Sequence, residues 1–150
     1  MQQIDNFLKQ QDLKDIKEIV LDAKFPWALN HGVSYPDDGH IQFTHTIYRD
    51  NEFKSSFTLG GLDIFVQSLK ITSLVRAKFN LLPRNENIIE HDAHIDIPNP
   101  PANLKTAILY LNTNNGYTKF ETGEKIASVE NKLIIFDAST KHSGTTNNCD

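Results

Sequence analysis

The stretch TAILYLNTNNGYTKFETGEKIASVENKLIIFD, residues 106–137, decides the fold class. Short apolar runs alternate in it with turn residues, which predicts strands at 106–111, 117–121, 125–129 and 132–137. The predicted turns between them are Asn114-Asn115-Gly116, Thr122-Gly123-Glu124 and Glu130-Asn131. The first of these is a strong signal for a hairpin. Many short strands joined by Asn and Gly turns are typical of a β-sandwich or barrel.

The residues before this stretch predict helices first and further strands later. Apolar residues at helical spacing indicate helices over 5–24 and 59–73, and the second half of 31–50 is predicted as a strand. From about residue 74 the pattern changes to strands, at 75–82 and 93–97. We therefore expect one domain, with residues 1–73 as a helical or mixed support and 74–150 as the β core.

Composition excludes several classes of protein. A chain of 150 residues that is 39% hydrophobic and has nine Phe can bury a real core. A net charge of −4, with scattered Lys and Arg, gives no expectation of nucleic-acid binding. The single Cys149 is compatible with a reducing compartment, and neither a signal peptide nor a membrane-length apolar run is visible. We expect a soluble, cytoplasmic protein without a membrane partner, of unknown oligomeric state.

His94-Ile95-Asp96, followed much later by His142, is the candidate metal site. In an extended segment the side chains alternate, so His94 and Asp96 share one face while Ile95 packs on the other. Two imidazoles and one carboxylate form the facial triad that suits non-heme Fe(II), because the opposite coordination positions remain open. Neutral imidazoles and an ionised carboxylate are the binding forms, so metal binding should weaken at low pH.

Neighbouring acidic and imidazole groups receive other predictions. Asp92 shares the face of the triad, and could orient a ligand His or be a solvated acid at the rim. His91 falls on the opposite face and is predicted at the surface. The three histidines outside the triad are predicted as surface or loop residues: His31, His40 and His45. A phosphate-binding loop, a Ser nucleophile elbow and a Cys metal cluster are all absent from the sequence.

The C-terminal half, residues 76–146, resembles the Fe(II)/2-oxoglutarate-dependent dioxygenases, in particular their prolyl-4-hydroxylase-like branch. The residues that carry the resemblance are KFNLLP (78–83), His94-Ile95-Asp96, TAILYLN (106–112), GYTKF (116–120), NKLIIFD (131–137) and His142-Ser143-Gly144. The family fold is a double-stranded β-helix, a distorted jelly roll with N-terminal helices outside it. The resemblance therefore implies a mainly β protein of this type.

The resemblance also implies a chemistry. Fe(II) would be held by His94, Asp96 and His142, with 2-oxoglutarate and O2 as co-substrates and ascorbate as a candidate additional cofactor. No catalytic residue beyond the metal ligands is implied. The reaction would hydroxylate a C–H bond, of a prolyl residue in a peptide or protein or of a small molecule. In the family a Tyr at the position of Tyr110 binds the distal carboxylate of 2-oxoglutarate.

The resemblance also implies further contacts to 2-oxoglutarate, for which the sequence gives less support. Thr106 would lie near Tyr110, and Asn80 on the first strand would line the pocket, whereas Leu82 stands where some relatives have another tyrosine. Tyr110 could instead be a core aromatic whose hydroxyl binds whichever partner is available.

One feature departs from the family pattern. Relatives use an Arg or Lys one strand beyond the distal His to pair with 2-oxoglutarate, but none of the eight residues after His142 is basic. We therefore expect the core to lack its last strand, and favour a natural chain that continues beyond residue 150. Substitution by Arg76, Lys78 or Lys119 is a second explanation, Lys141 being expected to point to the wrong face. Loss of co-substrate binding is the third.

Two alternatives to a hydroxylase remain at this point. The same fold could be a non-catalytic barrel that binds a metal or ligand only structurally. It could also be a cupin-like metal site that uses a different co-substrate and needs no basic residue.

Overall fold

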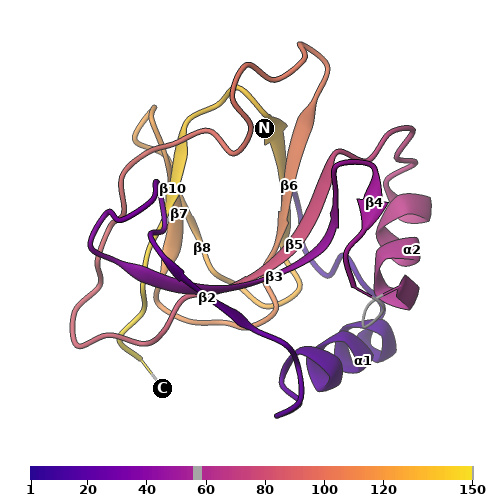
Figure 1. The fold of residues 1–150 in the computed structure, drawn as a ribbon, viewed down its shortest axis with the longest axis horizontal. Helices are drawn as coiled ribbons and strands as arrows, with labels where there is room; N and C mark the ends of the chain where they lie inside the picture. The colour runs from indigo at the N-terminus through magenta and orange to yellow at the C-terminus, as the bar shows by residue number, and fades with distance from the viewer. Residues whose placement is uncertain (56–58, 150) are drawn as a thin grey trace. The chain divides into compact units, whose positions relative to one another are not determined.

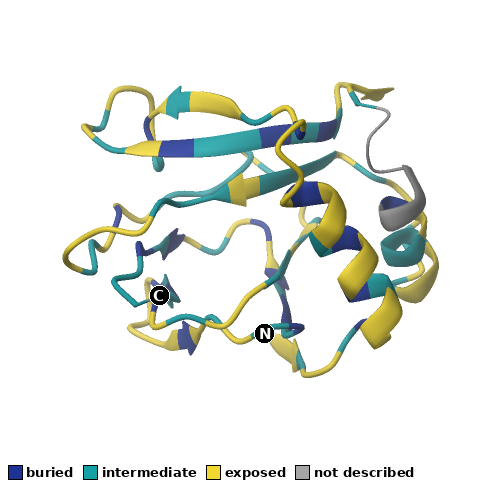
Figure 2. Ribbon diagram, turned by 90° about the horizontal axis from the view of Figure 1, so that it is seen from below, coloured by how far each residue is buried: buried dark blue, intermediate teal, exposed yellow. Residues whose placement is uncertain are grey.

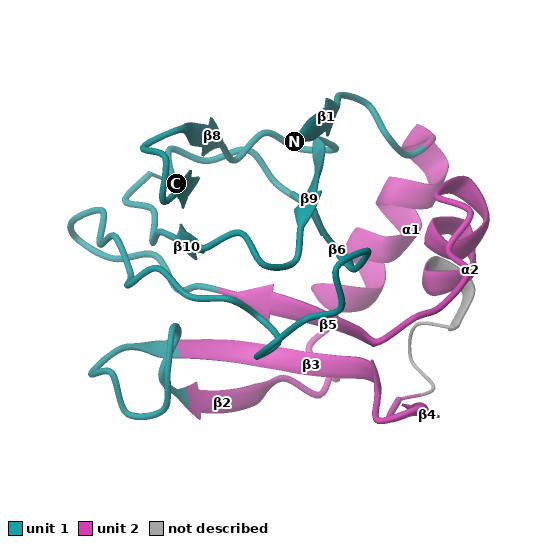
Figure 3. Ribbon diagram, turned by 90° about the horizontal axis from the view of Figure 1, so that it is seen from above, with its two compact units in different colours: residues 1–8, 31–41, 82–150 teal, residues 9–30, 42–81 magenta. Residues whose placement is uncertain are grey.

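The computed structural model describes residues 1–55 and 59–149. The chain divides into two compact units, each built from separate stretches of sequence (Figure 3). Unit 1 contains residues 1–8, 31–41 and 82–150, and unit 2 contains residues 9–30 and 42–81. The described residues form ten strands and two helices, and six of the strand pairings are antiparallel. The prediction of a mainly β protein with helices towards its N-terminus is confirmed.

Unit 1 contains two three-stranded sheets (Figure 1). The first has the order β1-β9-β6, formed by Gln2–Ile4, Leu133–Asp137 and Lys105–Leu109. The second has the order β10-β7-β8, formed by His142–Gly144, Tyr117–Phe120 and Lys125–Ala127. Strand β9 lies between two partners, which explains its nearly continuous apolar sequence.

The core of unit 1 joins its two sheets. Phe120 and Ile126 from the second sheet form one cluster with Ile134 and Phe136 from β9, and the rings of Phe120 and Phe136 meet edge to face at 5.0 Å. Ile134 is fully buried. Burial of an aliphatic or aromatic side chain of this size contributes roughly 1.5–3 kcal/mol, so these four residues are a main source of stability in the unit.

The predicted turn at Thr122-Gly123-Glu124 is confirmed, but the prediction of a hairpin at Asn114-Asn115-Gly116 is wrong. β6 pairs with β9, whereas β7 pairs with β8 and β10, so residues 110–116 connect two different sheets. The Asn114 side chain accepts a hydrogen bond from Gly116 N at 2.8 Å, a local turn that does not need paired strands on either side. Gly123 has a φ of +89°, which favours glycine in the true hairpin.

The predicted helix over 5–24 is shorter at both ends, and its first residues, 5–9, form turns and irregular structure. Residues 2–4, just before it, form β1 and pair with β9, with Ile4 opposite Leu133. Helix α1 then spans Gln10–Val20 in unit 2 and buries Leu13, Ile16 and Val20. These three residues lie on one face at helical spacing, and Figure 2 shows short buried segments between exposed ones along the helix.

The second predicted helix is confirmed as α2, Leu59–Ser68, and also ends earlier than the pattern indicated. Lys70 adopts a positive φ of 51°, and Ile71 N binds the carbonyl of Val66 at 3.0 Å. A left-handed residue followed by a bond of this span is a helix-ending motif that apolar periodicity cannot reveal.

The sheet of unit 2 is organised around the long strand β3, Ile41–Arg49. Its partners are β2 (Ala28–His31), β4 (Glu52–Phe53) and β5 (Arg76–Leu81). The strands predicted in the second half of 31–50 and at 75–82 are therefore confirmed, while β2 and β4 were not predicted. In the part of the chain described, no helix has the length and apolar character needed to cross a membrane.

Candidate metal centre

The structure brings together the three side chains predicted as metal ligands. One potential ligand atom each from His94, Asp96 and His142 lies within 4.8 Å of the other two. His142 is buried and the other two residues are half-buried. All three belong to unit 1, and the set contains the two imidazoles and one carboxylate of a facial triad.

The segment that carries His94 and Asp96 is not the strand predicted at 93–97. Its contact with β10 is an isolated bridge, in which His94 and His142 exchange both main-chain hydrogen bonds at 2.9 and 3.0 Å. The next bridge upstream joins Glu90 to Thr145. Positive φ at Asn99, within a segment rich in proline, ends extended structure just beyond Asp96. The single bridge is nevertheless sufficient to place the two histidine rings 5.2 Å apart.

Both imidazoles in the triad have the same local hydrogen bond. Nδ1 of His142 lies 3.1 Å from the carbonyl of Thr140, and Nδ1 of His94 lies 3.3 Å from the carbonyl of Asp92. A carbonyl can only accept, so each neutral ring carries its proton on Nδ1 and presents the lone pair at Nε2. Nε2 of His142 lies 3.5 Å from Oδ2 of Asp96. Metal-binding histidines are commonly oriented in this way, so the donor set fits a divalent ion.

Aromatic residues of the core surround the buried histidine of the triad. The ring of Phe136 meets the His142 ring at 4.8 Å, and Phe120 lies at 6.3 Å. An apolar wall of this kind restricts water and lowers the local dielectric constant beside a metal site.

Asp92 combines parts of its two predicted roles. Its main-chain carbonyl accepts the bond from His94, while its carboxylate is exposed and accepts a hydrogen bond from the Tyr35 hydroxyl at 3.0 Å. That bond is the main reason why the pKa of Tyr35 is raised. The backbone atom that contacts His94 could not be read from side-chain chemistry.

The surface prediction for His91 is wrong. The side chain is only 5% exposed and packs edge to face on His40 at 4.8 Å. Among the described residues neither of its ring nitrogens has a hydrogen-bond partner, and burial lowers its pKa. The prediction assumed strict alternation of faces, which does not hold in a segment that is not a strand. His40 is half-buried and His31 is exposed, as predicted for surface or loop residues.

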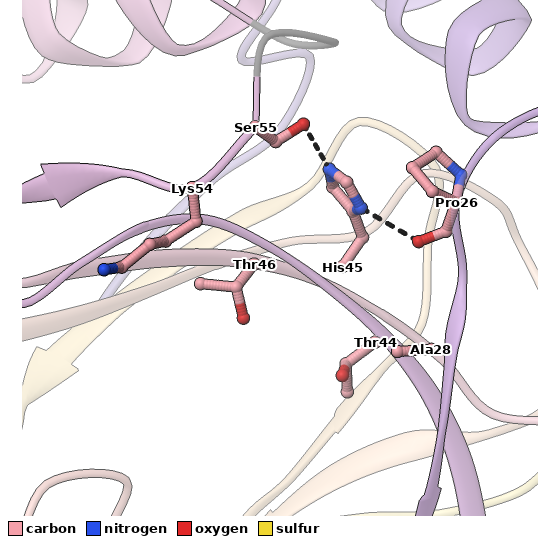
Figure 4. Close-up of a pocket in the computed structure, with 7 residues that line it drawn as sticks. All are labelled: Pro26, Ala28, Thr44, His45, Thr46, Lys54 and Ser55. Atoms are coloured by element: carbon pink, nitrogen blue, oxygen red, sulfur yellow. Dashed lines mark hydrogen bonds between the residues drawn. The ribbon is translucent and has the colours of Figure 1, made fainter.

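The surface prediction is also wrong for His45, which is buried on β3 in unit 2. Figure 4 shows its ring between Pro26 and Ser55, at the wall of a pocket of about 510 Å³. Nδ1 lies 3.0 Å from the Pro26 carbonyl and Nε2 lies 2.7 Å from Ser55 Oγ. Phe25 covers the ring at 4.5 Å. Both nitrogens are therefore satisfied, and the residue fits a structural role in this unit.

Tyr110, predicted to contact 2-oxoglutarate, is half-buried and packs against the core cluster of unit 1. Its hydroxyl donates to Thr118 Oγ1 at 2.7 Å, and burial raises its pKa. Thr106 and Ile108 are half-buried, whereas Ala107 between them is exposed, which agrees with the predicted shared face. Asn80 is exposed on β5 in unit 2. The co-substrate roles of these residues stay predictions.

The basic residues considered as co-substrate anchors have other surroundings. Lys119 binds Glu90 at 2.5 Å and occupies the face of β7 opposite the buried Thr118 and Phe120. Lys141 is exposed and pairs with Glu121 at 3.5 Å, in keeping with its predicted direction. Arg76 and Lys78 belong to β5 in unit 2.

Comparison with known proteins adds evidence at the level of the fold. No family model and no curated protein matches the sequence. The fold is similar to that of a prolyl-4-hydroxylase. The crystal structure of the Pseudomonas putida enzyme matches with a TM-score of 0.55 over 98% of this chain and 85% of that one, at 14% sequence identity. At this identity the match shows the fold, and its agreement with the sequence resemblance supports the jelly-roll class.

Proposed function

We propose that the protein is an Fe(II)- and 2-oxoglutarate-dependent dioxygenase that hydroxylates a C–H bond. The observation that carries the proposal is the triad of His94, Asp96 and His142, whose potential ligand atoms lie within 4.8 Å of one another. The fold that holds them is similar to that of a prolyl-4-hydroxylase. Fold alone does not determine function, so the donor chemistry of these three residues is the decisive support.

The residues of this chain would perform a limited set of tasks. Nε2 of each histidine and the Asp96 carboxylate would hold the ion, while Thr140 and Asp92 fix the imidazole tautomers. When bound, iron and 2-oxoglutarate supply the oxidising chemistry: substrate C–H, O2 and 2-oxoglutarate give C–OH, succinate and CO2. Phe136 and Phe120 would limit water beside the site.

Tyr110 is the proposed contact to the distal carboxylate of 2-oxoglutarate. Its hydroxyl now donates to Thr118, so binding would require that hydrogen to turn from Thr118 to the carboxylate. Thr106 is proposed as a further contact, and ascorbate as an additional cofactor. A prolyl residue in a peptide is the substrate class we favour, by analogy with the structurally similar enzyme.

Conversion of 2-oxoglutarate to succinate tests the proposal. With Fe(II) and O2 the wild-type protein should form succinate, and Asp96→Asn should reduce the rate by more than about 100-fold, because loss of a ligand exceeds the effect of an outer partner. Asp137→Asn is the matched control, since Asp137 is exposed and pairs with Lys105. Absence of succinate from wild-type protein with iron bound would contradict the proposal.

A non-catalytic metal-binding barrel is the second candidate. The observation that favours it is the ion pair between Lys119 and Glu90. Because Lys119 is engaged there, it is a poor candidate for the basic residue that would bind 2-oxoglutarate. This alternative predicts that wild-type protein binds a metal and that Asp96→Asn does not. It also predicts that neither the wild-type protein nor the variant converts 2-oxoglutarate to succinate.

A further inference from the structure

A tight turn in unit 1 is folded around the carboxylate of Asp38. Three consecutive main-chain N–H groups, of Val33, Ser34 and Tyr35, donate to Oδ2 at 2.9, 2.8 and 3.4 Å. The N–H of His40 donates to Oδ1 at 3.0 Å. Desolvation alone would raise the pKa of Asp38, but these four donors hold it at about 2. The turn is therefore organised by a charge that is present at every physiological pH.

The side chains of this turn hold Asp92 at two points. Ser34 Oγ donates to the main-chain carbonyl of Asp92 at 2.6 Å, and the Tyr35 hydroxyl donates to its carboxylate at 3.0 Å. The two contacts join segments 57 and 58 residues apart in the sequence. Together they fix both the position and the rotation of the Asp92 peptide group.

That peptide group is also the acceptor for the His94 ring. The carbonyl of Asp92, held by Ser34, lies 3.3 Å from Nδ1 of His94. The corresponding carbonyl for His142 is that of Thr140, in the turn between β9 and β10. In the part of the chain described, His94 lies in an isolated bridge to His142 and not in a regular strand.

We propose that Ser34 and Tyr35 are positioning residues for the metal centre. They hold the Asp92 carbonyl where it keeps the His94 proton on Nδ1, which leaves Nε2 available as a ligand. The metal part of this inference rests on the proposed function. The tautomer part does not, because it concerns the metal-free protein.

Nitrogen-15 NMR of the histidine rings in metal-free protein tests the tautomer directly. At about pH 8, above the ordinary His pKa, the wild-type protein should show His94 and His142 mainly protonated at Nδ1. In Ser34→Ala/Tyr35→Phe, His94 should shift measurably towards the Nε2-protonated form while His142 does not change. His142 is thus an internal control in the same spectrum.

Co(II) affinity of the same variants tests the consequence for metal binding. The double variant should bind Co(II) about 10-fold more weakly, as is usual when an outer partner of a ligand His is lost. Tyr117→Phe is the matched control, because Tyr117 donates a similar bond to the carboxylate of Glu90 at 2.5 Å. Its Co(II) affinity should remain within about twofold of wild type.

The outcomes separate this inference from the proposed function. An unchanged His94 tautomer, or an unchanged Co(II) affinity, in the double variant overturns the positioning role. If wild-type protein binds no metal, the proposed function fails, while the NMR measurement still decides whether the turn fixes His94. Tyr35→Phe alone, which removes one exposed bond, provides a second variant if the double variant unfolds.

Discussion

At the scale of the single residue, the rings of His94 and His142 make the same kind of hydrogen bond to the main chain. In each, the main-chain carbonyl two positions earlier lies within 3.3 Å of Nδ1. The order His-x-Asp…His, taken with the strand pattern and the resemblance to the dioxygenases, predicted which side chains meet. The bridge between His94 and His142 places them together as strand pairing would. The supporting carbonyls and Tyr35 could not be predicted, since backbone acceptors and contacts over 57 residues leave no local pattern.

The wrong predictions for His91 and His45 have a common physical reason. A histidine is amphipathic, and its burial depends on which neighbours cover the ring rather than on its own polarity. Phe25 covers His45 and His40 packs on His91, and neither contact follows from spacing along the chain.

Glu90 provides a prediction at the residue scale. Hydrogen bonds from Lys119, Tyr117 and Lys125 hold its pKa at about 2, below its ordinary value of 4.5. A carboxyl group whose pKa is lowered by folding stabilises the folded state at pH values above its pKa in the unfolded chain. This stabilisation is lost as the pH falls from about 4.5 to about 2. Glu90→Gln should therefore lower stability at pH 7 and leave it unchanged near pH 2.

Urea unfolding measured across this pH range checks the effect. Glu124→Gln, in the turn between β7 and β8, serves as an exposed control. An equal loss of stability for Glu90→Gln at both pH values would show that the charge of Glu90 is not responsible.

At the scale of the element, the strands of the β9 region were predictable and their partners were not. The apolar run at 132–137 predicts β9 correctly, but β1, which pairs with it, was not predicted, since only one of its three residues, Ile4, is apolar. Pairing is decided by contacts distant in sequence, such as Ile4 with Leu133. The same limit explains why Asn114-Asn115-Gly116 joins two sheets instead of two paired strands.

Asn131 provides a prediction for the junction of β1 and β9. It is 2% exposed, has a φ of 62°, and binds the main-chain N–H and carbonyl of Leu8 at 2.8 and 2.9 Å. Asn131→Ala would leave both groups unsatisfied and should lower the free energy of unfolding by about 2–4 kcal/mol. Urea unfolding measures the loss.

Asn6→Ala is the matched control for this variant. Asn6 also has a positive φ, 52°, but is exposed. The cost of alanine in the left-handed region is thus present in both variants, and Asn6→Ala should lose only this cost, about 1 kcal/mol. Similar losses for the two variants would contradict the role assigned to the Leu8 bonds.

At the scale of the whole molecule, the fold class was predictable although the topology was not. Strand and turn signals indicated a sandwich or barrel, and the likeness to the Pseudomonas putida prolyl-4-hydroxylase covers 98% of the chain. The prediction that the core lacks its last strand remains a prediction, together with the identity of the basic residue.

Metal binding should stabilise the molecule as a whole. At a concentration 100 times its dissociation constant, a divalent ion that binds only the folded state adds about 2.7 kcal/mol. For a chain of 150 residues this corresponds to a rise of about 5–10 °C in Tm. The rise should disappear in His142→Ala and persist in His31→Ala, because His31 is exposed and outside the triad. Scanning calorimetry with Co(II) measures both, and an equal rise in His142→Ala would place the ion elsewhere.

In the proposed function, the triad would hold iron and leave coordination positions open for 2-oxoglutarate. Absorption spectroscopy of the protein with Fe(II) and 2-oxoglutarate, without oxygen, tests it most directly. A weak visible charge-transfer band should appear in the wild-type protein and be lost in His94→Ala and Asp96→Ala. A wild-type spectrum without this band at saturating 2-oxoglutarate, or a band that persists in both variants, would contradict the account.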